Sequence, residues 1–272
     1  MTKAKKVLFI TQEITPYVPE SSMSTVGRIL PQLIQEGGTE IRTFMPRWGI
    51  INERRNQLHE VIRLSGMNIV IDDTDHPLII KVASIQAARM QVYFIDNDDY
   101  FHKRAMMMDE NSVEYEDNLE RAIFYARGVL ETVKKLRWIP DVIHCQGWIS
   151  AIAPLLIKTA FAEDTPFVDT KVVFDAYAEM PQMPPPVNIK ECLEFRNINT
   201  QLLDDTGIDF TAPNALGKLA VHFSDAIVLE HADAQPELAV YAKERGIIVT
   251  IRETDAPLTD AYNTTYNAVI EE

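Results

Sequence analysis

The N-terminal segment of the chain has the pattern of a strand followed by a loop and a helix, which is the opening unit of a parallel α/β sheet. Residues 7–11 form a short apolar run that suits a buried strand. Apolar residues then recur at helical spacing from Val26 to Ile34, just before Gly37 and Gly38. The pattern therefore predicts a βα unit at the start of a fold in which strands and helices alternate.

The loop between these two elements lacks the glycines with which such units bind phosphate. A phosphate there needs backbone N–H groups brought close at the helix N-terminus, and glycine permits that approach because it has no Cβ. This loop instead carries Pro16, Pro19, Glu20, Ser21 and Ser22. The prolines remove two donors, and Glu13 and Glu20 bring negative charge to the place of a diphosphate. We therefore expect either a loop that only connects two elements or a phosphate site that has lost its chemistry.

The remainder of the chain continues the alternation. Strands are predicted over 40–45, 141–144, 171–174, 225–229 and 247–251, and helices over 117–137, 149–158, 215–223 and 237–245. Four β-rich runs between 61 and 95 follow one another without a helix, which favours an antiparallel β-hairpin insertion at about 60–95. The segment MPQMPPP predicts an extended proline-rich loop at about 180–187. The expected fold is a doubly wound, mostly parallel α/β sheet in one domain spanning residues 1–272.

Length and charge limit the classes of protein to which the chain can belong. With 272 residues it can bury a full core, but it is short for two complete α/β domains. Lys and Arg number 26 against 40 Asp and Glu, and the net charge of −14 disfavours nucleic acid and anionic membranes as partners. The start lacks the pattern of a signal peptide, so a cytoplasmic protein is expected. Only two cysteines, Cys145 and Cys192, are present, and we expect reduced thiols.

Five blocks of sequence resemble, in order and spacing, the N-terminal half of bacterial glycogen and starch synthases. They are VLFITQEITPYV near the start, FMPRWG at 44–49, VYFIDNDDYF at 92–101, ERAIFYARGVLETV at 120–133 and PDVIHCQGWISAIAPLLIK at 140–158. The similarity covers roughly residues 5–230 and weakens after Lys171. That family folds as two Rossmann-like domains facing a cleft, the GT-B arrangement. It transfers glucose from a sugar nucleotide, usually ADP-glucose, to the end of an α-1,4-glucan. The resemblance implies that this chain holds one of the two domains.

The segment HCQGW is a candidate sugar-binding site. The strand over 141–144 delivers His144, Gln146 and Trp148 to the carboxyl edge of the sheet, where ligands collect in doubly wound folds. An imidazole, an amide and an indole can hydrogen-bond and stack with a sugar, although His144 and Trp148 could equally close the core at the strand end. The family has a second histidine and an aspartate before the tryptophan, where this chain has Gln146 and Gly147. The resemblance therefore implies an altered acceptor site.

Two further departures from the family affect its chemistry. The first βα loop of the family carries a lysine, a threonine and two glycines that contact the sugar nucleotide, and the matching positions here are Pro19, Glu20, Ser21 and Ser22. A family histidine that faces the reacting sugar corresponds, in a loose alignment, to Tyr177. Tyrosine cannot reproduce an imidazole that titrates near neutrality. The second domain of the family, which neutralises the leaving diphosphate, is expected to be missing from this chain.

These departures predict a glycogen-synthase-like domain that is catalytically impaired alone, a pseudoenzyme that binds an α-1,4-glucan, a sugar nucleotide or a partner protein. The candidate contact residues are Glu13, His144, Gln146, Trp148 and Tyr177, and none is a confident catalytic residue. One alternative is an active synthase half completed by a separate chain that supplies the C-terminal domain. Another is a non-catalytic scaffold that binds proteins through its proline loop and acidic surface.

No cofactor or metal is expected from the sequence. The group Asp72, Asp73, Asp75 and His76 could chelate a metal, but its spacing favours a solvated hairpin turn. The run from Asp96 to Asp99 is typical of a cap at the start of a helix.

Overall fold

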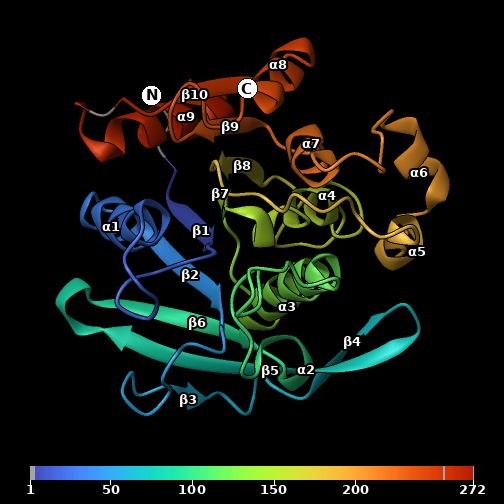
Figure 1. Cartoon of the computed structure of the whole chain (residues 1–272). Helices are drawn as coiled ribbons and strands as arrows, with labels where there is room; N and C mark the ends of the chain where they lie inside the picture. Colours follow the sequence, from blue (N-terminus) through green and yellow to red (C-terminus); the bar gives the residue numbers. More distant parts are fainter. Residues whose placement is uncertain (1–3, 254, 272) are drawn as a thin grey trace.

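The computed structural model describes residues 4–253 and 255–271, and a single mixed sheet runs through them (Figure 1). The strand order is β10-β9-β8-β7-β1-β2-β6-β5-β3, and β4 pairs with β5 outside this path. The strands are β1 (Lys6–Ile10), β2 (Glu40–Pro46), β3 (His59–Glu60), β4 (Met67–Ile71), β5 (Thr74–Ile85), β6 (Met90–Asp96), β7 (Val142–Gln146), β8 (Lys171–Ala176), β9 (Ala226–Leu229) and β10 (Ile248–Ile251).

Neighbouring strands from β10 to β6 are parallel, and β5 is antiparallel to β6. The predicted mostly parallel, doubly wound sheet is therefore confirmed. The helices are α1 (Ser22–Glu36), α2 (Asp98–Phe101), α3 (Asn118–Leu136), α4 (Ala153–Lys158), α5 (Ile189–Leu193), α6 (Thr200–Asp205), α7 (Ala215–His222), α8 (Pro236–Glu244) and α9 (Leu258–Glu271). Within the described ranges, no helix combines the length and apolar character needed to cross a membrane.

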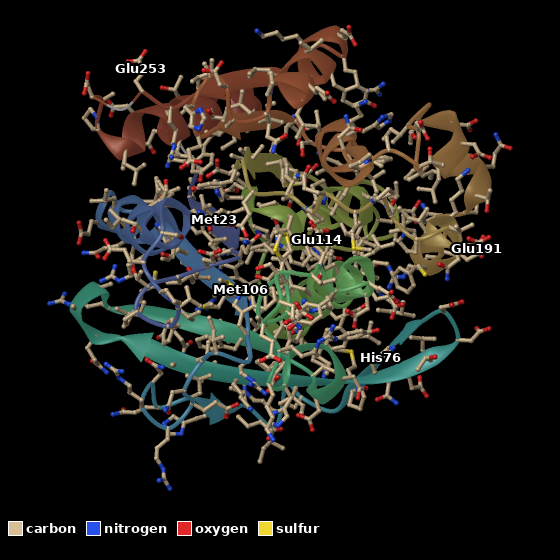
Figure 2. The ribbon with its side chains drawn as sticks, in the orientation of Figure 1. Met23, His76, Met106, Glu114, Glu191 and Glu253 are labelled. Carbon is tan, nitrogen blue, oxygen red and sulfur yellow. The ribbon has the colours of Figure 1, made fainter. Side chains whose placement is uncertain are left out.

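Side-chain alternation along the strands explains how the two faces of the sheet are covered. In β1, Val7 and Phe9 pack with α1 and α9, whereas Leu8 and Ile10 belong to the larger cluster that includes α3. Successive residues of a strand point to opposite faces, so each central strand is apolar on both sides. Side chains from both layers of helices fill the space against the sheet (Figure 2). The consequence for β7 is that His144 shares a face with Val142, the face that α9 covers.

The insertion differs in part from its prediction. Strands β4 and β5 form the expected antiparallel hairpin, and its turn contains Asp72 and Asp73 with positive φ. The run over 61–64 is not a strand: it forms a turn in which Leu64 donates to the Val61 carbonyl, and the short β3 precedes it. Strand β6 belongs to the main sheet as a parallel partner of β2.

The hairpin turn and the helix cap proposed from the sequence are present, but His76 lies buried in β5 and not in a solvated turn. Asn97 accepts hydrogen bonds from the backbone of Asp99 and Tyr100, which makes it the N-cap of α2. His76 is buried, and its Nε2 lies 2.9 Å from the Tyr100 hydroxyl, away from the hairpin aspartates. The predicted helix over 149–158 is shorter than expected, because a 3₁₀ turn (Trp148–Ser150) precedes α4.

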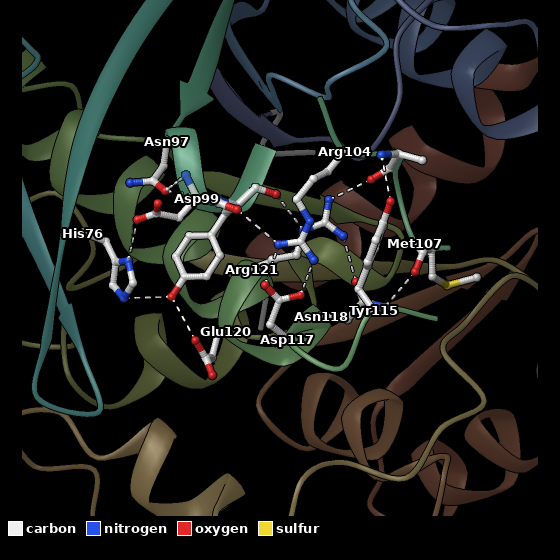
Figure 3. Close-up of polar contacts among 12 residues, drawn as sticks. His76, Asn97, Asp99, Arg104, Met107, Tyr115, Asp117, Asn118, Glu120 and Arg121 are labelled. Atoms are coloured by element: carbon white, nitrogen blue, oxygen red, sulfur yellow. Dashed lines mark hydrogen bonds and ion pairs between the residues drawn. The ribbon is translucent and has the colours of Figure 1, made fainter. Parts of the chain in front are cut away.

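A buried arginine fixes the loop between α2 and α3 (Figure 3). The guanidinium of Arg121 donates to the carbonyls of Tyr100, Ala105 and Met106 at 3.0, 2.9 and 2.8 Å. It also donates to Asn118 Oδ1 at 2.8 Å. Burial, and then the charge of Arg104, lower the pKa of Arg121 to about 10. Three carbonyls of the loop thus have a buried partner, which lowers the cost of passing the loop over the core.

Candidate functional site

The carboxyl ends of β7 and β8 and the start of α1 meet at one point of the sheet edge. Gln146 Nε2 lies 3.2 Å from the Tyr177 hydroxyl and 3.3 Å from the carbonyl oxygen of Met23. Both Gln146 and Tyr177 are buried. Burial, and next the negative charge of Asp175, raise the pKa of Tyr177 well above its ordinary value. The structure thus brings these two candidate residues together, with Tyr177 in its protonated form.

The first βα loop is closed by its own hydrogen bonds. Glu13 is 3% exposed, and its carboxylate accepts from Ser21 Oγ at 2.7 Å and from Gln12 Nε2 at 3.1 Å. Ser21 is also the N-cap of α1, where its hydroxyl accepts from the backbone of Ser24 at 2.9 Å. Pro19 and Glu20 are exposed on the outside of the loop. Of the four loop residues predicted to match the family's donor contacts, Ser21 therefore caps the helix and bonds Glu13.

A second carboxylate, that of Glu230 directly after β9, reaches the same helix end. Ser22 Oγ donates to Glu230 Oε1, and Arg252 Nη2 lies 3.5 Å from that same oxygen. A helix N-terminus carries partial positive charge and favours an anion. Here the carboxylates of Glu13 and Glu230 lie at that helix end, where they accept from the hydroxyls of Ser21 and Ser22. A phosphate at the start of α1 would have to displace the Glu230 carboxylate or share the space with it.

His144 and Trp148 are core residues in this arrangement. His144 is 1% exposed, and its Nδ1 lies 2.9 Å from the Tyr266 hydroxyl of α9. Trp148 is fully buried, with its ring 6.3 Å from that of Trp48. The geometry matches the alternative in which both residues close the core. Direct contact of either with a sugar stays a prediction, and it would require the covering elements to move.

Several polar residues of this region were not identified from the sequence. Asp175 is fully buried, and its Oδ2 accepts from the Tyr262 hydroxyl at 2.6 Å and lies 3.5 Å from His144 Nε2. Burial, and then the Asp175 charge, raise the pKa of Tyr262 well above its ordinary value. The spacing of Tyr262, Tyr266 and Val269 is that of one helix face, which is the signal by which α9 could have been found.

Two cavities open beside these residues. One of about 510 Å³ lies between the end of β10 and the start of α9 and is lined in part by Glu230 and Arg252. The other, of about 350 Å³, lies beside the proline-rich loop and is lined in part by Gln182, Asn214 and Gln235. The Asn214 Oδ1 atom is buried and has no hydrogen-bond donor among the residues described. The neutral amides of the lining are suited to hydroxyl groups, and the lining also includes the acidic Glu237, to which Asn214 Nδ2 donates.

No metal centre is formed in the part of the chain that the structure describes. Within residues 4–253 and 255–271, no three His, Cys, Asp or Glu side chains converge in a geometry that could hold an ion. Burial raises the pKa of Cys145 above its ordinary range and that of Cys192 to about 11, so both thiols remain protonated.

Comparison with known proteins places these observations in a family context. The family model described as the starch synthase catalytic domain matches residues 6–238. The glycogen synthase of Chlorobium limicola is 37% identical over 173 residues, which are 63% of this chain and 35% of that protein. The glycogen synthase of Chlorobaculum tepidum is 38% identical over 169 residues, which are 62% of this chain and 35% of that protein.

The fold also has a solved counterpart. The catalytic domain of starch synthase IV from Arabidopsis thaliana, bound to ADP and acarbose, superimposes with a TM-score of 0.68 and 16% identity, covering 96% of this chain and 53% of that one. The aligned region spans about a third of the length of the glycogen synthases that the chain matches.

Proposed function

The chain belongs to the starch synthase catalytic domain family, and on that premise we propose that it binds the end of an α-1,4-glucan without transferring glucose by itself. The observation that carries the proposal is that the carboxylates of Glu13 and Glu230 lie at the start of α1, bonded to the Ser21 and Ser22 hydroxyls. Glucosyl transfer from a sugar nucleotide needs negative charge to be stabilised on the departing diphosphate. Two internal carboxylates at that place oppose it.

The positive charge of Arg252 near this edge is already paired. Arg252 is paired with Glu230, and its guanidinium lies over the Tyr177 ring at 5.7 Å. The Tyr177 hydroxyl accepts from Gln146, so it is held in the interior. Partial desolvation, and then the charge of Glu13, raise the pKa of Glu179, a further acidic group at this edge. The local field thus disfavours a second anion such as ADP.

We place the glucan in the cavity beside the proline-rich loop. Gln235 Nε2 donates to the carbonyls of Tyr177 and Ala178, and Gln182 Nε2 donates to that of Met180, so both amides are tied to the backbone beside the cavity. Asn214 Oδ1 has no partner among the described residues but is shielded from solvent, so it would accept from a sugar hydroxyl only after the side chain turns towards the cavity. Such a site binds a neutral polar ligand, and the net charge of −14 does not penalise it.

Titration calorimetry with maltoheptaose and with ADP-glucose tests the binding. We expect heat with the oligosaccharide and none with the nucleotide. Asn214→Ala should weaken binding of the oligosaccharide, whereas Gln201→Ala, an amide on α6 outside the cavity, should not. Binding of ADP-glucose, or oligosaccharide binding that both variants leave unchanged, would contradict the proposal.

A second candidate function is an active synthase half that another polypeptide completes. It is favoured by the match of the starch synthase catalytic domain model to residues 6–238. Incorporation of labelled glucose from ADP-glucose into glycogen, with and without co-purified proteins, distinguishes the two. Activity that appears only with an added protein supports the second candidate, and activity of the chain alone contradicts both.

A further inference from the structure

The proline-rich loop has few backbone donors, and one carboxylate accepts from most of them. Residues 181–187 read PQMPPPV, so only Gln182, Met183 and Val187 carry a backbone N–H. Glu114, in the loop between α2 and α3, accepts from the Gln182 N–H at 2.8 Å through Oε1 and from the Met183 N–H at 3.0 Å through Oε2. A single side chain therefore binds two of the three backbone donors of this segment.

The other hydrogen bonds of the segment are local. Gln182 Nε2 donates to the Met180 carbonyl at 2.9 Å, and the Pro186 carbonyl accepts from the Ile189 N–H at 3.0 Å. Over the part of the chain that the structure describes, Glu114 is thus the one hydrogen-bonding partner of 181–187 that is distant in the sequence. The position of the segment relative to the remainder of the fold depends on this contact and on packing.

The loop that carries Glu114 is held by several bonds of its own. Met108 and Glu114 form an antiparallel bridge, and inside it Asp109 and Val113 exchange hydrogen bonds of 2.8 and 2.9 Å. The guanidinium of Arg121 binds two carbonyls in the preceding part of the same loop (Figure 3). The contact therefore joins a well-anchored carboxylate to a segment that has little other anchorage.

Two cavities border the segment. Pro181 and Gln182 line the cavity of about 350 Å³, which residues at the starts of α7 and α8 also line. A smaller cavity of about 40 Å³ is lined in part by residues 184–186 and by residues of the stretch 114–119. Val187 is fully exposed. Packing alone thus leaves the segment room to move, because empty space adjoins both its first and its later residues.

We propose that residues 181–187 are a movable wall of the larger cavity and that Glu114 is the positioning residue that fixes this wall for the glucan. The inference rests on the proposed function, because this is the cavity in which we place the glucan. Glu114 is not among the residues that line it, so its effect is indirect. Four prolines restrict the torsions of the segment, which therefore moves as one piece. A wall that is already ordered spares the ligand the cost of ordering it.

Hydrogen exchange of the unliganded chain tests whether Glu114 fixes the segment. In Glu114→Ala the amides of Gln182 and Met183 both lose their acceptor, so their exchange should become about tenfold faster. Glu114→Gln has one acceptor oxygen in place of two, so it protects only one amide at a time and should give a smaller acceleration. Glu110→Ala removes the same charge from an exposed site of the same loop and should change neither amide. Exchange that Glu114→Ala does not accelerate would overturn the inference.

Calorimetric titration with maltoheptaose tests the link between this contact and the cavity. Glu114→Ala should weaken binding about fivefold to tenfold, and Glu114→Gln by less, because the ligand must then order the wall. Glu110→Ala should bind as the wild type does, and both Ala variants should have similar melting temperatures, which separates loss of loop order from loss of the fold.

Two further outcomes are informative. Equal affinity of the wild type and Glu114→Ala, despite faster exchange in the variant, would overturn the inference. A wild-type chain that binds no maltoheptaose would contradict the proposed function, whereas the exchange of the unliganded chain would still confirm or refute that Glu114 fixes the segment.

Discussion

The hydroxyl of Tyr266 lies 2.9 Å from Nδ1 of His144, so a helix near the end of the described chain supplies the partner of a histidine in the centre of the sheet. One turn earlier, Tyr262 donates to Asp175 at 2.6 Å. His144 and Asp175 lie in adjacent parallel strands, and α9 covers both. The Nδ1 atom of His144, a candidate for ligand contact by the family resemblance, thus has its hydrogen-bond partner within the chain.

The Tyr262–Asp175 bond should contribute measurably to stability. Tyr262→Phe leaves a fully buried carboxylate without its hydroxyl donor, and we expect the free energy of unfolding to fall by about 1–3 kcal/mol. Urea denaturation measures the difference. Tyr241→Phe is the matched control, because its hydroxyl bonds to His222 in a partly exposed position, and it should cost less. Equal costs would mean that burial of Asp175 does not govern the effect.

His222 should make stability depend on pH. Partial burial, and then the charge of Arg245, lower the pKa of His222 to about 4. In the unfolded chain the pKa is about 6.5, so between these values the unfolded state binds more protons and stability falls as the pH is lowered from about 6.5 towards about 4. His222→Gln should flatten this part of the profile of unfolding free energy against pH. His59→Gln, at an exposed site, should not change it, and identical profiles for the two variants would contradict the expectation.

Arg121 should be essential to the loop that it binds. Arg121→Met leaves three loop carbonyls without their donor, and we expect a loss of about 3 kcal/mol or more. Hydrogen exchange should also become faster over residues 100–107. Arg104→Met breaks a two-bond contact with Asp117 in a partly exposed position, so it should cost only about 1 kcal/mol. A cost for Arg104→Met as large as for Arg121→Met would show that the carbonyl bonds are not the cause.

The sequence predicted those elements whose apolar pattern is long and local. Helix α3 and the β1–α1 unit were found because their periodicity extends over many residues. Helix α9 was not predicted, because Thr, Asn and Asp occupy many of its positions and weaken the apolar pattern. The short helices α5 and α6 follow the proline-rich loop and have too few turns to produce a periodic signal.

The candidate site was predictable only to the level of the strand ends. The sequence correctly placed His144 in a strand of a parallel sheet. It could not show what covers the face to which His144 points, because the partner, Tyr266, is 122 residues away in the chain. The negative charge of the first loop was recognised from Glu13 and Glu20, whereas the contribution of Glu230 depends on the position of β9 and had no local signal.

Removing the second internal carboxylate should improve the binding of phosphate groups. Glu230→Gln keeps a partner for Ser22 but removes the charge from the α1 N-terminus and releases the Arg252 guanidinium. A charge near a helix end is worth about 0.3–1 kcal/mol, so affinity for ADP should rise roughly twofold to fivefold. Titration of the Ser22 and Met23 amide resonances with ADP measures it. Glu36→Gln, at the opposite end of the same helix, is the control. If both variants gave the same titration as the wild type, the carboxylate of Glu230 would not be what excludes the anion.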